Sequence, residues 1–198
     1  MMQAFRRSHR TGTPHGVTLI EMILVFVLVG IMCSLAVPYI NAPGFRADAE
    51  ARNTRTILEM AQRLAITHQY DVVVSFDTIK MQIRVLEDTN NNNIADAGER
   101  VHYHGFEYGM KFAVPPANSG LNGTVATSSV TGTNIISLSG MPSIVFLRSG
   151  SASTDAQIYL TSPRSTYISD YRGITVTQST GRTTYSRFLN KVWTLANI

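Results

Sequence analysis

Between Glu21 and Arg46 the chain contains no charged residue, and this stretch constrains the fold more than any other part of the sequence. Its central part, Met22–Ile40, reads MILVFVLVGIMCSLAVPYI and has about the length that a helix needs to cross a bilayer. A buried core helix is the weaker interpretation, because a water-soluble domain rarely covers a helix that is apolar on every side. Residues 1–16 are basic, so the positive-inside rule predicts a cytoplasmic N-terminus and an external C-terminal part.

The charges are distributed unevenly along the 198 residues. There are 17 Lys+Arg and 13 Asp+Glu, a net charge of +4, which by itself suggests nucleic acid or an anionic membrane as a partner. Residues 1–16 contain no acid and three arginines, Arg6, Arg7 and Arg10. Residues 17–140 hold 8 basic and 11 acidic side chains, and residues 141–198 hold 6 and 2. The overall charge is therefore no argument for DNA, although the C-terminal region is locally basic.

Glu21 lies at the start of the apolar segment, where an unpaired carboxylate is costly and usually marks a function. The residues Gly16-Val17-Thr18-Leu19-Ile20 precede it, after the basic leader. This pattern resembles the class III (prepilin) leader of type IV pilins and type II secretion pseudopilins. In that family a prepilin peptidase cuts after the glycine and methylates the new N-terminus. The resemblance implies a leader of residues 1–16, a cut between Gly16 and Val17, and an N-methylated Val17 where phenylalanine is commoner.

The resemblance also implies roles for Glu21 and Pro38. Glu21 becomes the fifth mature residue, and its carboxylate pairs with the N-terminal amine of a neighbouring subunit, which selects the register of the filament. Pro38 lies where the long helix of the family commonly kinks. Two other processing routes stay open. They are a secretory signal cut after Ala36 and a twin-arginine signal at Arg6-Arg7.

Downstream of the membrane segment, the sequence predicts one amphipathic helix and then a series of strands. Residues 41–44, Asn-Ala-Pro-Gly, are expected to break or bend the chain, and a helical period resumes over 45–68. Alternating patterns predict strands over 71–76, 80–86, 100–106, 134–138, 143–147, 157–160, 173–177 and 183–188. Residues 117–133 are expected to form a loop with a tight turn at Asn122-Gly123.

These elements predict an α+β fold in which a long N-terminal hydrophobic helix packs on a mostly antiparallel β-sheet headpiece. The expected parts are a leader (1–16), a transmembrane or filament-core helix (17–42), the amphipathic half of the helix (43–69) and a β-rich periplasmic headpiece (70–198). The order resembles the GspH/FimT branch of the pilin-like family. Its headpiece features here are the Asp/Asn-rich turn ending at Glu99, the strand 144–147 running into Gly150, and a late hairpin at Gly181-Arg182.

An Asp/Asn-rich segment, residues 88–99, has the spacing of a calcium loop. The candidate oxygen ligands are Asp88, Asn90, Asn92, the Ile94 carbonyl, Asp96 and Glu99. The flanks are strands, so an EF-hand is not expected, and a hydrated hairpin loop is the alternative. His102 and His104 share one face of a strand and could supply two metal ligands, but no third ligand is indicated. Cys33, in the apolar segment, is interpreted as a small hydrophobic residue. No catalytic motif is present, so an enzyme is not expected.

The basic C-terminal region interleaves cations with aromatic residues, as a nucleic-acid surface would. Some FimT-like minor pilins bind DNA through a C-terminal glycine-arginine element, and the resemblance assigns that role to Arg182 and Arg187. A basic surface that faces neighbouring subunits is the alternative. The sequence thus predicts a minor pilin or pseudopilin in the bacterial inner membrane, with other pilins and a prepilin peptidase as partners. A DNA-binding minor pilin and a secreted or anchored calcium-dependent binding module stay open.

Overall fold

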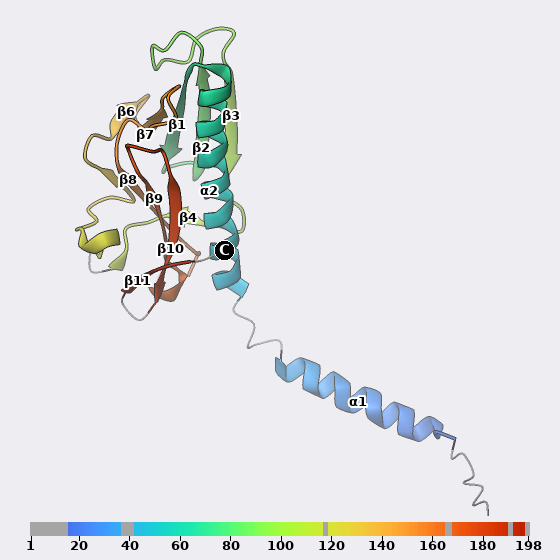
Figure 1. The fold of residues 1–198 in the computed structure, drawn as a ribbon. Coiled ribbons are helices and arrows are strands. Elements are labelled where there is room, and N and C mark those ends of the chain that lie inside the picture. Colours follow the sequence, from blue (N-terminus) through green and yellow to red (C-terminus); the bar gives the residue numbers. More distant parts are fainter. Residues whose placement is uncertain (1–15, 37–41, 117–118, 165–167, 190–191, 197–198) are drawn as a thin grey trace, which may run out of the picture. The chain divides into compact units, whose positions relative to one another are not determined.

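The computed structural model describes residues 16–36, 42–116, 119–164, 168–189 and 192–196. The chain divides into two compact units, Met1–Asn41 and Ala42–Ile198. The first contains helix α1 (Leu19–Ala36), and the second contains helix α2 (Ala42–His68) and all the strands. We call the second unit the headpiece (Figure 1).

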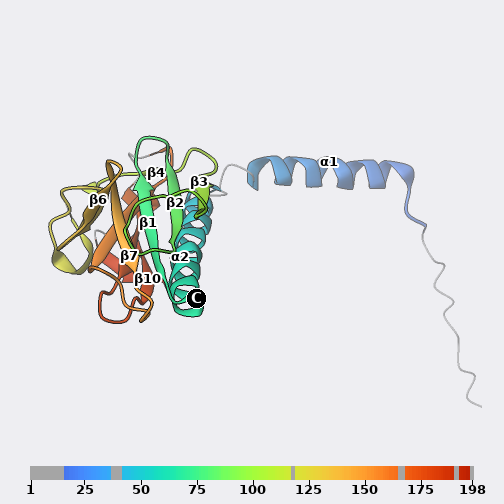
Figure 2. The same ribbon diagram turned by 90° about the horizontal axis from the view of Figure 1, so that it is seen from above.

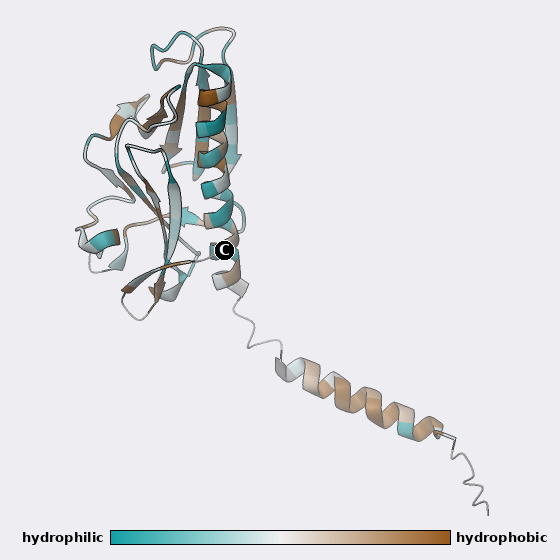
Figure 3. Cartoon of the chain, in the orientation of Figure 1, coloured by the Kyte–Doolittle hydropathy of each residue, from teal (hydrophilic) through white to brown (hydrophobic). Residues whose placement is uncertain are grey.

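Apart from Glu21 in its first turn and Ser34 near its end, helix α1 lacks polar side chains, and most of it is brown in Figure 3. Its side chains from Leu19 to Ser34 are all exposed. Within the described residues, no helix is both long and apolar enough to cross a membrane. Pro38, the predicted kink, lies outside the described residues.

Helix α2 begins three residues earlier than the sequence pattern predicts, because Ala42, Pro43 and Gly44 are already helical. The prediction of a break at 41–44 is wrong for these three residues. Proline is compatible with the first turn of a helix, where its missing N–H leaves no hydrogen bond unmade. The predicted end at His68 is confirmed.

The first sheet is antiparallel and has the strand order β3-β2-β1-β7-β6. Its strands are β1 (Asp71–Asp77), β2 (Gln82–Asp88), β3 (Arg100–Gly105), β6 (Ile136–Leu138) and β7 (Met141–Phe146). Strand β2 was predicted over 80–86. The β1–β2 pairing starts at Asp77 opposite Gln82, and the Asp77 carboxylate accepts the amides of Ile79 and Lys80, so the first predicted strand residues form the turn instead.

The second sheet has the order β11-β10-β9-β8-β4, and β5 also pairs with β8. Its strands are β4 (Lys111–Phe112), β5 (Val130–Gly132), β8 (Ala156–Thr161), β9 (Arg172–Val176), β10 (Thr183–Leu189) and β11 (Val192–Leu195). Two short 3-10 helices, η3 (Leu121–Gly123) and η4 (Ile168–Asp170), lie beside it. The predicted turn at Asn122-Gly123 is confirmed, since both residues have positive φ, whereas β4, β5 and β11 were not predicted.

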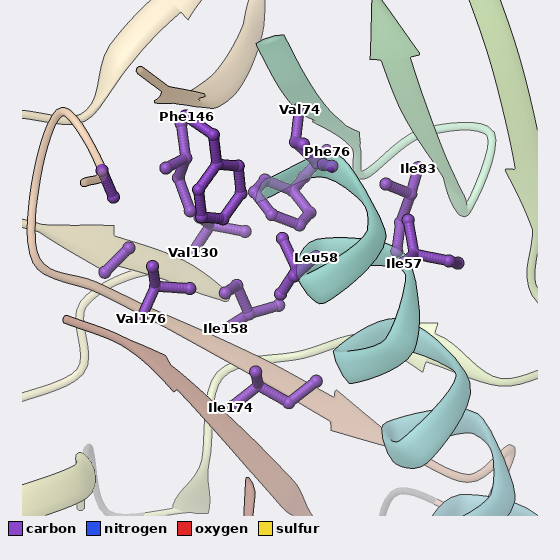
Figure 4. Packing of buried hydrophobic residues seen from close by; sticks show 14 of the residues in the cluster. Ile57, Leu58, Val74, Phe76, Ile83, Val130, Phe146, Ile158, Ile174 and Val176 are labelled. Carbon is purple, nitrogen blue, oxygen red and sulfur yellow. The ribbon is translucent and has the colours of Figure 1, made fainter. Parts of the chain in front are cut away.

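The main core lies between the inner faces of the two sheets and α2, which contacts both (Figures 1, 2 and 4). Leu58 of α2 is fully buried and points toward Phe76 and Ile158 from the two sheets. Burying a side chain of this size contributes about 1.5–3 kcal/mol to stability. The helix packed on mostly antiparallel sheets confirms the α+β prediction at that level.

Candidate functional site

The predicted cleavage junction is accessible from solvent. Gly16, Val17 and Thr18 precede α1 without belonging to it, and the Val17 side chain is 67% exposed. A Cβ atom at Gly16 would meet no atom within 4 Å, so local packing gives no reason for a glycine there.

Thr18 and Glu21 form a capping box at the start of α1. The Glu21 amide donates to Thr18 Oγ1 at 3.3 Å, and the Thr18 amide donates to Glu21 Oε2 at 3.5 Å. A carboxylate in the first turn also interacts favourably with the helix dipole. The sequence interpretation assigned Glu21 to assembly alone and missed Thr18, although the Thr-x-x-Glu spacing is itself the signal. Glu21 therefore has a partner within its own chain.

A second cluster fixes the start of α2 to the second sheet through Asp48. Asp48 Oδ1 accepts hydrogen bonds from Arg172 Nε at 2.6 Å and from Arg187 Nε at 2.8 Å. Arg172 is almost fully buried, and its other nitrogens donate to the carbonyl oxygens of Gly44 and Ser169. We call Asp48, Arg172 and Arg187 the Asp48 clasp.

The two arginines predicted to bind DNA lie in different surroundings. Arg187 pairs with Asp48, whereas Arg182 lines a surface hollow of about 410 Å³ together with Arg55 and Arg63 of α2. Arg55 itself pairs with Glu59 at 2.7 Å. Part of the C-terminal positive charge is thus neutralised within the headpiece, and DNA binding stays a prediction.

The Asp/Asn-rich loop forms a network of hydrogen bonds with its own amides. The Asp88 carboxylate accepts the Asn92 amide at 3.1 Å and the Asn93 amide at 2.5 Å. Asp96 accepts the side-chain amides of Asn90 and Asn92. Within the described ranges, no three His, Cys, Asp or Glu side chains gather closely enough to hold a metal ion. The calcium site stays a prediction, and the structure adds that Asx-type hydrogen bonds order this loop.

Acid should loosen this loop. Hydrogen bonds from Asn90 and Asn92 lower the pKa of Asp96, and the Asp96 amide, followed by Thr89, lowers the pKa of Glu99. Because these pKa values are depressed in the folded loop, the two carboxylates stabilise it above their unfolded pKa values, and the stabilisation is lost as the pH falls through the folded values. Hydrogen-exchange protection factors of the Thr89 and Asp96 amides should fall as the pH is lowered from about 5 to about 2.

The control for this experiment is the Leu147 amide, which donates to the Ser151 carbonyl oxygen and so depends on no carboxylate. Its protection should change much less over the same range. Equal changes at Leu147 and Thr89 would show that the whole headpiece responds to acid and would refute the local effect.

The two histidines of β3 lie at the edge of the first sheet, opposite Val85 and Ile83. His102 Nε2 is 3.4 Å from Glu87 Oε1, and the Tyr70 hydroxyl donates to the other oxygen of the same buried carboxylate. Burial, followed by the hydrogen bond to Glu87, raises the pKa of Tyr70 to about 12. Burial, more than the charge of His102, lowers the pKa of His104. This cluster thus gives His102 a structural partner.

Comparison with known proteins gives structural neighbours only. No protein-family model and no curated protein matches the chain. Two structures of the minor pseudopilin EpsH from the type 2 secretion system of Vibrio cholerae are similar to it, at 12% and 13% identity and TM-scores of 0.47 and 0.46. In both comparisons the matched region covers 71% of this chain. It covers 95% of the EpsH chain in the first structure and 92% in the second. The type IV minor pilin FimU of Pseudomonas aeruginosa has 13% identity and a TM-score of 0.43, covering 69% of this chain and 84% of its own.

Proposed function

We propose that the chain is a minor pilin or pseudopilin that enters a filament of a type II secretion system or type IV pilus. The observation that carries the proposal is the order of three features over a few residues. An accessible Gly16-Val17 bond is followed by a capped helix start with Glu21 in its first turn, and then by the apolar and exposed side chains of residues 22–33. Such a helix requires lipid or neighbouring helices to cover it.

The same helix serves two successive environments in this proposal. Before assembly, the uncharged stretch between Glu21 and Arg46 anchors the subunit in the bacterial inner membrane, with the leader in the cytoplasm and the headpiece in the periplasm. A prepilin peptidase then removes residues 1–16 and methylates Val17. In the filament, neighbouring subunits cover the apolar surface, and the Glu21 carboxylate pairs with the amine of a neighbouring Val17.

The test separates the charge of Glu21 from its capping role. Glutamine also closes a capping box, so Glu21→Gln keeps the start of α1 and removes only the charge, whereas Thr18→Ala removes the cap and keeps the charge. We expect both variants to be cleaved between Gly16 and Val17 by a co-expressed prepilin peptidase. We expect only Glu21→Gln to lose incorporation into filaments.

Mass spectrometry of the mature N-terminus and immunoblotting of sheared filaments are the measurements. A chain that starts at methylated Val17 supports the proposal, and one that starts at Val37 supports a secretory signal and refutes it. Normal incorporation of Glu21→Gln together with loss in Thr18→Ala would assign Glu21 to helix capping alone. A secretion operon or a minor-pilin gene cluster beside the gene distinguishes the two filament systems.

A further inference from the structure

One end of the headpiece carries a group of exposed aromatic and aliphatic side chains. This end contains the first turn of α2, η4 and the β10–β11 hairpin (Figure 1), and Tyr108 belongs to it through its contact with Arg46. We call its exposed residues the base: Phe45, Arg46, Tyr108, Ile168, Leu189 and Val192. Phe45 is 68% exposed and Tyr108 63%. Large side chains of this kind gathered at one end of a domain mark an interaction surface more often than isolated ones do.

Hydrogen bonds and a side-chain ion pair bring these elements together. Arg172 Nη1 donates to the Ser169 carbonyl oxygen of η4, and its Nη2 donates to that of Gly44 in α2. The Arg187–Asp48 ion pair brings the end of β10 to the same turn of α2. Leu189 is paired with Val192 across the β10–β11 hairpin. The base is therefore a fixed surface of the headpiece.

The chemistry of the base matches the headgroup layer of a bilayer. The Arg46 guanidinium lies 4.7 Å from the centre of the Tyr108 ring, so a cation and an amphipathic aromatic side chain are presented together. Tyrosine is enriched at membrane–water interfaces, where its ring meets acyl chains and its hydroxyl meets water, and arginine contacts lipid phosphates. At this end Arg46, Arg164, Arg172 and Arg187 are matched in number by Asp48, Glu50, Glu107 and Asp170, and Arg164, Arg172 and Arg187 form ion pairs with two of these acids. Arg46 is exposed, so it is the cation that the base presents to an anionic lipid headgroup.

The position of the base in the chain points to the same partner. Only residues 37–41 separate the end of α1 from the start of α2. Fully extended, this connection spans about 20 Å at most, so an embedded α1 keeps Phe45 and Arg46 near the bilayer. The opposite end of the headpiece, beyond His68, instead carries the Asp/Asn-rich loop, which is tied there by the Asp71 amide bonded to Asn91 Oδ1 (Figure 1).

We propose that the base rests in the headgroup layer of the bilayer while the subunit waits for assembly. The inference rests on the proposed function, because it requires α1 to be embedded. Phe45, Tyr108 and the aliphatic residues enter the interfacial layer, and Arg46 meets phosphate groups. Leaving the membrane for the filament then requires release of this surface as well as extraction of α1.

The test uses the full chain in vesicles of phosphatidylcholine with one quarter phosphatidylglycerol, on the order of the anionic content at which basic surfaces bind. Fluorophores are placed by Val192→Cys in the base and by Ile94→Cys at the opposite end, each with Cys33→Ser. The pair is matched, since Val192 is 60% and Ile94 61% exposed. With a nitroxide on the lipid headgroup, we expect several-fold stronger quenching at position 192 than at position 94.

Native Cys33 distinguishes failure of this inference from failure of the proposed function. A fluorophore on Cys33 should be quenched by a nitroxide placed deep in the acyl chains. If it is, and positions 192 and 94 are quenched equally, the base does not rest on lipid although α1 is embedded. If the Cys33 fluorophore remains accessible to a water-soluble quencher, the membrane part of the proposed function fails.

Two further variants test the chemistry of the surface. Phe45→Ser with Tyr108→Ser should reduce quenching at position 192 to the level of position 94, and Ile79→Ser, at an exposed residue of the β1–β2 turn, should leave it unchanged. Thermal unfolding of each variant checks that the headpiece remains folded. Quenching that depends on protein density in the membrane would assign the base to contacts between subunits and overturn the proposal.

Discussion

Replacing Asp48 by alanine is expected to lower the free energy of unfolding of the headpiece by about 3–5 kcal/mol. The substitution leaves two guanidinium groups without their carboxylate, and the Arg172 side chain is only 5% exposed. A buried charge that has lost its partner is penalised far more than an exposed one, because water cannot replace the missing interaction. Urea unfolding of residues 42–198, which form a compact unit with their own core, measures the effect.

Glu59→Ala is the matched control for this prediction. It breaks the Arg55–Glu59 pair, which has a similar N–O distance of 2.7 Å but whose two side chains are 27% and 29% exposed. Exposed pairs of this i,i+4 type contribute about 0.3–0.5 kcal/mol. If Asp48→Ala and Glu59→Ala lower the free energy of unfolding by the same amount, the Asp48 clasp behaves as a surface ion pair and its buried geometry is wrong.

Replacing Gly181 by alanine should cost about 2 kcal/mol or more, because it combines backbone strain with a steric clash. Gly181 has a φ of 63°, a region that favours glycine. A Cβ atom there would lie 2.5 Å from Gln62 Nε2 and closer still to the Gly150 carbonyl oxygen. Gln62 donates to the carbonyl oxygens of Gly150 and Thr180, so the clash falls where α2 holds two turns together.

Gly123→Ala separates the two contributions. Gly123 also has a positive φ, 73°, but a Cβ atom there meets nothing within 4 Å, so only the backbone strain remains. Thermal and urea unfolding should show a clearly larger loss for Gly181→Ala than for Gly123→Ala. Equal losses would mean that the turns move apart freely and that the Gln62 contacts do not hold them.

The sequence predicted the elements whose residues form regular patterns of their own. The pattern at residues 71–76 predicted β1, which the structure buries on both faces. The period of 45–68 predicted most of α2, because burial of one face of a helix imposes that period locally. The strand and the strand boundary that the sequence did not predict also have local causes. Strand β4 has two residues, too few for a pattern, and the Asx turn at Asp77 moved the start of β2.

The contacts of the candidate site were less predictable, since most of them join distant parts of the chain. Asp48 is 124 residues from Arg172 and 139 from Arg187, and no spacing in the sequence connects them. The arginines were therefore counted as free cations of the C-terminal region. The capping box could have been predicted, because Thr18 and Glu21 are three residues apart and the Thr-x-x-Glu spacing is visible in the sequence. Local chemistry could be predicted, whereas pairing across the fold required the structure.

The Asp48 clasp also determines how the headpiece would carry a mechanical load. If α1 enters a filament as proposed, a pull along it would reach the headpiece through the first turn of α2, where Arg172 bonds both Gly44 and Asp48. From there the force passes into two neighbouring strands, β9 and β10, which are paired along five residues. Spreading a load over adjacent paired strands makes tearing cooperative, since no single strand can detach first. In the proposed filament, the Asp48 clasp would lie on the path by which a pull passes from α2 into the second sheet.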